Sequence, residues 1–114
     1  MRADVSYRLL GLLGLGVRGG RAVVGVELVR DAAKRGKLAL AVIAPDASRH
    51  SLAKVTPLLE AKRVRIIEGP AAARLGAAVG RESTAAVGVM DRSLARGILA
   101  IVDGAPVSPR GGSV

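Results

Sequence analysis

Arginine is the side chain best able to do chemistry in this sequence, and that chemistry is the binding of anions. The chain of 114 residues carries 18 Lys+Arg against 9 Asp+Glu, a formal net charge of +9. Most of these bases are arginines, whose planar guanidinium donates paired hydrogen bonds to phosphate oxygens or guanine edges. Such a surplus is the electrostatic signature of a nucleic-acid binder, so we expect a nucleic acid as the partner.

Residues for catalysis are few. The chain has no Cys, and His50 is its single histidine. A thiolate nucleophile, a zinc finger and a multi-histidine metal site are therefore excluded. Phe and Trp are absent and Tyr7 is the only aromatic residue, which weighs against binders that stack single-stranded bases on aromatic platforms. The composition predicts a binding protein and not an enzyme, with no cofactor and no metal.

One glycine motif has the form of a dinucleotide-binding fingerprint. Gly14-Leu-Gly16-Val-Arg-Gly19 matches G-x-G-x-x-G letter by letter. The fingerprint requires a strand before it and a helix after it, so that pyrophosphate meets the helix N-terminus. Here the pattern predicts a helix before and a strand after. We therefore interpret these glycines as parts of a helix end and its turn.

Apolar spacing and turn residues predict helices and strands in alternation. Helices are expected over 5–17 and 25–35, after the cap Ser48, between Pro70 and Gly80, and from the cap Asp91 through Val102. Strands are expected over 21–24, 38–44, 64–68 and 84–90. In the second helix, Glu27/Arg30 and Asp31/Arg35 have the spacing of intrahelical ion pairs. In the third, a kink or restart is expected, with Thr56 as cap and Pro57 at the first position.

The order of these elements predicts an α/β fold. The continuous apolar run 38–44 is typical of a strand buried on both faces, and the alternation favours a three-layer α/β/α sandwich with a four-stranded central sheet. One domain is expected over 1–102. The Pro- and Gly-containing tail 103–114 is predicted to be disordered. No spanning segment or export signal is evident, so a cytoplasmic location is expected and no membrane partner.

The same pattern suggests where an anion would bind. Arg18 and Arg21 flank the turn into the first strand, and Gly25 at the end of that strand opens a helix. A helix N-terminus presents free N–H groups and a positive dipole end. The loop 80–85, which enters the last strand, is a candidate second edge of the site. We therefore expect one basic face around Gly25 and this loop.

Several blocks of the chain follow a known family pattern in register. They include Leu9-Leu-Gly-Leu-Leu-Gly-Leu, Val23-Val-Gly25, Leu40-Ala-Val-Ile-Ala-Pro-Asp46-Ala-Ser48, Gly80-Arg-Glu82 and the strand at 86–89. In these blocks, across roughly residues 7–102, the chain resembles the ribosomal L-seven-Ae family, and more closely its small bacterial branch of YlxQ type. The resemblance implies an α/β/α sandwich and a non-enzymatic protein that binds kink-turn RNA.

The resemblance also implies a site. In the family, the helix after the first strand begins Gly-x-Asn-Glu-x-x-Lys and reads tandem G·A pairs, while a loop before the last strand packs on extruded nucleotides. By position Gly25 matches, but Glu27, Leu28 and Asp31 replace the Asn, Glu and Lys. In the loop, polar side chains stand where apolar ones are usual. An alternative is therefore a protein-interaction adaptor on the same fold, with weakened or lost kink-turn specificity.

These considerations give a set of expected RNA contacts. Those expected at phosphates are Arg18, Arg21, Arg30, Lys34 and Arg81. Those expected nearest the bases are Gly25, Glu27 and Leu28, with Glu82, Ser83 and Thr84 in the loop. The expected partner is kink-turn or ribosomal RNA, with the ribosome or a protein as further candidates.

Overall fold

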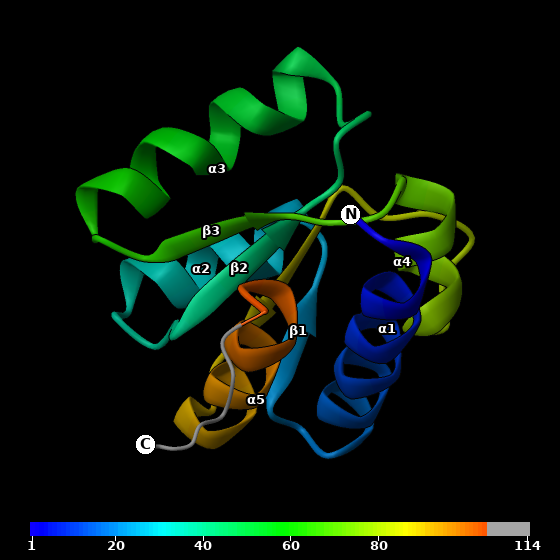
Figure 1. The fold of residues 1–114 in the computed structure, drawn as a ribbon. Coiled ribbons are helices and arrows are strands. Elements are labelled where there is room, and N and C mark those ends of the chain that lie inside the picture. The colour runs from blue at the N-terminus through cyan, green and yellow to red at the C-terminus, as the bar shows by residue number, and fades with distance from the viewer. Residues whose placement is uncertain (105–114) are drawn as a thin grey trace.

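A computed structural model describes residues 1–104, which form five helices and four strands. The helices are α1 (Ala3–Arg18), α2 (Val26–Lys34), α3 (Arg49–Ala61), α4 (Ala72–Ala78) and α5 (Arg92–Val102). The strands are β1 (Ala22–Val24), β2 (Leu40–Ile43), β3 (Arg65–Glu68) and β4 (Ala86–Val89). The predicted order of elements is confirmed (Figure 1). No helix in this part of the chain is both long and apolar enough to cross a membrane.

The strands pair in the order β1-β4-β2-β3. β2 and β3 are parallel, whereas β4 runs antiparallel to both β1 and β2. The last strand in sequence therefore lies inside the sheet, between two strands from the first half of the chain. The strands are shorter than predicted: in the run 38–44, only Leu40–Ile43 forms the strand. Ala39 and Ala44 each still donate one backbone hydrogen bond, to Val89 and Ala85.

Two layers of helices cover the two faces of this sheet, which confirms the α/β/α sandwich. Leu40 and Val42 point to one face, where they pack with residues of α1, α4 and α5. Ala41 and Ile43 point to the other face, where they pack with α2 and α3. Because side chains alternate across a strand, a strand covered on both sides must be apolar throughout, as 40–43 is.

The third helix corrects one expectation. α3 is one continuous helix in which Pro57 lies inside, and Thr56 is a helical residue and not a cap. Val55 and Leu59, on either side of Pro57, are both buried against the same face of the sheet. Residues four apart share a helix face only while the helix continues. Burial of this pair therefore outweighs the loss of one backbone hydrogen bond at the exposed Pro57.

The helix caps that the structure shows agree with those predicted from the sequence. Ser48 caps α3 by accepting a hydrogen bond from the Ser51 N–H at 3.1 Å. Asp91 caps α5 by accepting one from the Leu94 N–H at 2.8 Å. At the C-terminal end of α5, Asp103 accepts a 2.8 Å hydrogen bond from Arg65, so the start of the expected tail contacts β3. The disorder predicted for the tail falls on residues 105–114, outside the described residues.

Of the three motif glycines, Gly16 lies in the last turn of α1 and Gly19 is its C-cap, as predicted, whereas Gly14 lies further inside the helix. Gly14 and Gly16 lie inside the helix and are buried. A Cβ at Gly14 would lie 2.7 Å from the Ala78 carbonyl oxygen, and one at Gly16 would lie 2.5 Å from a Leu94 methyl. These two glycines therefore let α4 and α5 approach α1 closely, whereas the turn is made by Gly19 and Gly20.

Gly11, also inside α1, behaves differently and gives a testable expectation. A Cβ at Gly11 would meet nothing within 4 Å. Gly11→Ala should therefore raise the free energy of unfolding by roughly 0.5–1 kcal/mol, because alanine restricts the unfolded chain and favours the helix. Gly14→Ala should lower it, since its Cβ has no space. Thermal melts followed by circular dichroism measure both; a Gly11→Ala protein that melts below the wild type would contradict the expectation.

Candidate nucleic-acid interface

The turn from β1 into α2 depends on Gly25. Its φ of 98° lies in a region that side-chain-bearing residues rarely adopt. The Gly25 N–H donates a 2.8 Å hydrogen bond to the carbonyl of Ala86, at the start of β4. Glycine has no side chain to cap a helix, and α2 has no side-chain cap. The first N–H groups of α2 are therefore free to meet an anion at the positive end of the helix dipole.

The end of the loop 80–85 lies near the turn from β1 into α2, as predicted. Antiparallel pairing sets Val24, the last residue of β1, opposite Val87 near the start of β4. The end of the loop is held by two backbone bonds, from the Thr84 N–H to Ala72 and from the Ala44 N–H to Ala85. The start of α2 and the end of the loop therefore form one edge of the molecule, which we call the α2–loop edge.

Loop residues differ in how accessible they are. Arg81, Glu82 and Ser83 are exposed. Thr84 is buried, 8% exposed, and its hydroxyl donates to the Ala86 carbonyl at 3.1 Å. The Thr84 side chain therefore fixes the loop and is not presented to a ligand, unlike the role expected for it from the sequence.

Glu27, in the first turn of α2, does not pair as predicted. Its carboxylate accepts a 3.1 Å hydrogen bond from the Lys54 ammonium of α3, and not one from Arg30. This hydrogen bond, with the charge of Lys54, lowers the pKa of Glu27 below its usual value of 4.5. The ion pair is therefore complete above pH 4.5 and is lost as the pH falls through the lowered pKa. The packing of α2 on α3 brings Lys54 to the site.

The exposed face of α2 carries cations and one apolar side chain. Lys34 is exposed and has no ion-pair partner among the described residues. Arg30 is half-buried, and its Nε is buried without a hydrogen-bond acceptor in the described part of the chain. Leu28 is 51% exposed, one of the few large apolar side chains left open to solvent. The Asp31–Arg35 pair predicted on this helix is confirmed at 3.3 Å.

Arg18 and Arg21 are not brought to the start of α2. The Arg21 carbonyl accepts from the Met90 N–H, at the end of β4 remote from Ala86. Arg21 and Gly25 are separated by the length of β1, about 13 Å at the rise of an extended strand. Arg18 lines a hollow with Ala78 and Gly80 instead. Of the two arginines expected in one basic face, Arg21 is therefore remote from the start of α2, whereas Arg18 lies beside the first residue of the loop 80–85.

The chemistry available at the α2–loop edge is the binding of anions. Free N–H groups at the start of α2, Arg30 one turn later and the exposed Arg81 can meet phosphates, and Leu28 offers apolar contact. Lys34 adds a cation in the last turn of α2. Within residues 1–104, no three His, Cys, Asp or Glu side chains gather where a metal ion could be held. Lys54 is the residue that the sequence did not reveal; its place beside Glu27 follows from two helices covering one sheet face.

Comparison with known proteins gives consistent matches. The sequence model described as the Ribosomal protein L7Ae/L30e/S12e/Gadd45 family matches residues 8–96. The RNA-binding protein YlxQ of Bacillus subtilis (strain 168) is 29% identical over 92 residues, 81% of this chain and 92% of that protein. A solved protein of unknown function from Bacillus halodurans C superposes with a TM-score of 0.76 at 27% identity, covering 83% of this chain and 96% of that one.

A second solved structure shows the same fold at a greater distance in sequence. The 15.5kD RNA binding protein of Giardia lamblia superposes with a TM-score of 0.76 at 22% identity, covering 94% of this chain and 92% of that one. At this level of identity the likeness extends to the fold alone. The α/β/α sandwich predicted from the sequence is therefore found in solved proteins as well.

Proposed function

Because the chain belongs to the ribosomal protein L7Ae/L30e/S12e/Gadd45 family, we propose that it is a non-enzymatic RNA-binding protein of the cytoplasm. Its ligand is a structured RNA of kink-turn type, such as a segment of ribosomal RNA. The relative YlxQ, which is named as an RNA-binding protein, supports the ligand class. The net charge of +9 agrees with it, since phosphate contacts dominate the affinity of proteins for nucleic acids.

One observation carries this proposal: the hydrogen bond from the Gly25 N–H to Ala86 joins the uncapped start of α2 to the first residue of β4, directly after the loop 80–85. Two backbone segments that are remote in sequence thereby offer one edge to a folded RNA. In the proposed complex, the N–H groups of α2 and the side chains of Arg30, Lys34 and Arg81 bind phosphates. Leu28 packs on a base face, and Ser83 donates a hydrogen bond.

The side chains of α2 are better suited to bind an RNA by its shape than by hydrogen bonds to its base edges. Leu28 cannot hydrogen-bond a guanine, and the Glu27 carboxylate is occupied by Lys54 at 3.1 Å. Kinked RNA with a widened groove can be bound through its backbone geometry and splayed bases. The proposed ligand is therefore a bent RNA held mainly by its phosphates.

Titration of one RNA against its matched variant tests this proposal. The first RNA contains a kink-turn, and the second has its tandem G·A pairs replaced by Watson–Crick pairs. We expect tighter binding to the first and a fall in affinity with rising salt, because phosphate contacts release counterions. Equal affinity for the two RNAs would remove the kink-turn claim. A flat response to salt would remove RNA binding as a whole.

Glu27→Gln should strengthen RNA binding. The substitution removes a negative charge from the start of α2 and leaves the Lys54 ammonium without its carboxylate partner. Both changes favour a phosphate, so the affinity should rise by about two- to fivefold, the worth of an exposed charge interaction. Fluorescence anisotropy with the kink-turn RNA measures it, and Glu60→Gln, on the exposed part of α3, is the matched control. A weaker Glu27→Gln complex would indicate that the carboxylate itself contacts the RNA.

A further inference from the structure

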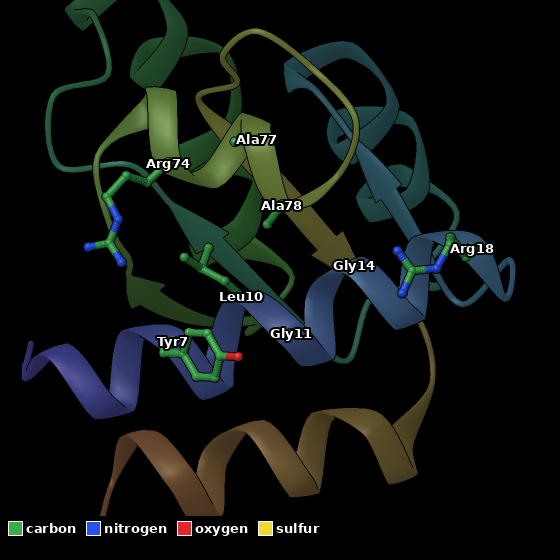
Figure 2. Close-up of a pocket in the computed structure, with 8 residues that line it drawn as sticks. All are labelled: Tyr7, Leu10, Gly11, Gly14, Arg18, Arg74, Ala77 and Ala78. Atoms are coloured by element: carbon green, nitrogen blue, oxygen red, sulfur yellow. The ribbon is translucent and has the colours of Figure 1, made fainter.

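A hollow lies between α1 and α4, outside the α2–loop edge. Its volume is about 490 Å³, and its wall is mostly apolar. The residues that line it are Tyr7, Leu10, Gly11, Gly14, Arg18, Arg74, Ala77 and Ala78. Figure 2 shows Arg74 and Arg18 at opposite ends of this hollow, which we call the α1–α4 groove, with the backbone of Gly11 and Gly14 between them.

Internal packing accounts for only one of the two glycines in the floor of this groove. Gly14 is required by the close approach of Ala78. Gly11 has no neighbour within 4 Å of a Cβ, although a glycine inside a helix costs roughly 1 kcal/mol relative to alanine. The missing side chain keeps the groove open. A helix whose own residues leave such a space unfilled is suited to contact with something outside the chain.

The charges around the groove are all positive. Neither Arg18 nor Arg74 forms an ion pair within residues 1–104, and no acidic residue lines the wall. Tyr7, beside the Arg74 end, is 78% exposed. Along α1, the positions Tyr7, Gly11, Gly14 and Arg18 follow one stripe, which spans about 16 Å, or three helical turns.

We infer that the α1–α4 groove docks an amphipathic helix of a partner protein, with small apolar side chains against Gly11 and carboxylates that reach Arg18 and Arg74. Gly and Ala on the wall allow a helix to approach closely, and the exposed Tyr7 supplies an aromatic anchor of the kind that interfaces use. The two arginines complement an acidic partner at either end. This inference does not depend on the proposed binding of RNA.

Other occupants fit the groove less well. Between its arginines the wall offers Leu10, Ala77 and backbone-only glycines, so the polar edges of an RNA base would be left without hydrogen bonds there. A second copy of this chain would bring further positive charge against Arg18 and Arg74, since the chain carries +9. An acidic helix removes both difficulties.

A designed peptide tests the inference. The probe is a fluorescein-labelled alanine- and leucine-rich helix of about 18 residues, with two glutamates about eleven positions apart. Its partner probe carries lysines in place of the glutamates. We expect saturable binding of the glutamate peptide, measured by fluorescence anisotropy with the full chain, and none of the lysine peptide. Equal binding of the two, or no binding of either, would overturn the inference.

Two variants locate the site. Gly11→Leu fills the groove and should lower the affinity for the glutamate peptide by about tenfold or more, because the new side chain clashes with the bound peptide. Arg74→Glu should lower the same affinity by roughly three- to tenfold, because it reverses the charge at one end of the groove. The control is Gly97→Leu, at an exposed glycine within α5 whose Cβ would only touch Leu12 at 3.9 Å. Thermal melts establish that each variant is folded.

The same variants separate the alternatives. Binding of the kink-turn RNA should be unchanged in Gly11→Leu, because Gly11 is outside the α2–loop edge. If Gly11→Leu weakened RNA binding and left the peptide unaffected, the groove would be an RNA site. If sedimentation showed a dimer of the wild type that Gly11→Leu dissociates, the occupant would be a second copy. Each of these results would overturn the inference of a partner helix.

Discussion

Replacing Arg30 and Lys34 together by alanine should weaken the binding of the kink-turn RNA by an order of magnitude or more. Arg30 lies one turn after the free N–H groups of α2 and Lys34 lies in its last turn, and neither has an ion-pair partner among the described residues. A single protein–phosphate interaction accounts for about 0.7–0.9 of the slope of log affinity against log salt. The double variant should therefore flatten that slope by about 1.5.

The chain offers a matched control for this experiment. Arg92 and Arg96 are also two cations four residues apart on one helix, and they too form no ion pair within residues 1–104. Arg92→Ala with Arg96→Ala changes the net charge by the same amount at α5, away from the α2–loop edge. We expect a much smaller loss of RNA affinity and a nearly unchanged salt slope. Equal losses in the two double variants would show that net charge alone decides binding.

Gly76→Ala should lower both the stability of the fold and its affinity for RNA. A Cβ at Gly76 would lie 2.4 Å from Ser83 Cα and 2.7 Å from its backbone N and C. These are backbone atoms that cannot rotate away, so the loop or α4 must move. Such overpacking costs roughly 1–3 kcal/mol. For a domain of this size each kcal/mol lowers Tm by about 4–8 °C.

The loss of affinity in Gly76→Ala has its own cause. Where the loop moves and not α4, it carries with it Arg81, Glu82 and Ser83, which are its exposed residues in the proposed RNA-binding surface. Thermal melts and RNA titrations below the melting range separate the two effects. Gly97→Ala is the control, because the same substitution inside α5 has space and should stabilise. A Gly76→Ala protein with an unchanged Tm would show that the loop does not pack on α4 in solution.

Local signals predicted the elements well, because a helix cap or a buried strand depends on residues close in sequence. Asp91 caps α5 and the run around Leu40–Ile43 forms a strand, both as predicted. Pro57 was misjudged because the local rule for proline competes with burial of Val55 and Leu59 on one face. The position of Thr84 within the loop was predicted, but its burial depends on α4 and β4, which pack around it.

The candidate site was only partly predictable for a related reason. The sequence placed Gly25 beside the end of the loop 80–85, and the bond from Gly25 to Ala86, the residue after that loop, agrees with it. The predicted ion-pair partner of Glu27 was wrong. Helical spacing favoured Arg30, whereas the packing of α3 on α2 places the Lys54 ammonium 3.1 Å from the Glu27 carboxylate. Arg18 and Arg21 are near Gly25 in sequence, but an extended strand separates residues quickly in space.

The sequence by itself determined which side chains are available to this protein: many arginines and few residues suited to catalysis. It also determined the α/β/α sandwich with an aliphatic core. It also determined the family, because the blocks that define it are local. The tertiary structure alone decided which cations share a surface. Insertion of β4 between β1 and β2 sets the loop 80–85 beside α2 and leaves Arg18 with Arg74 at the α1–α4 groove. Pairing between distant strands depends on packing of the whole sheet, and no local pattern encodes it.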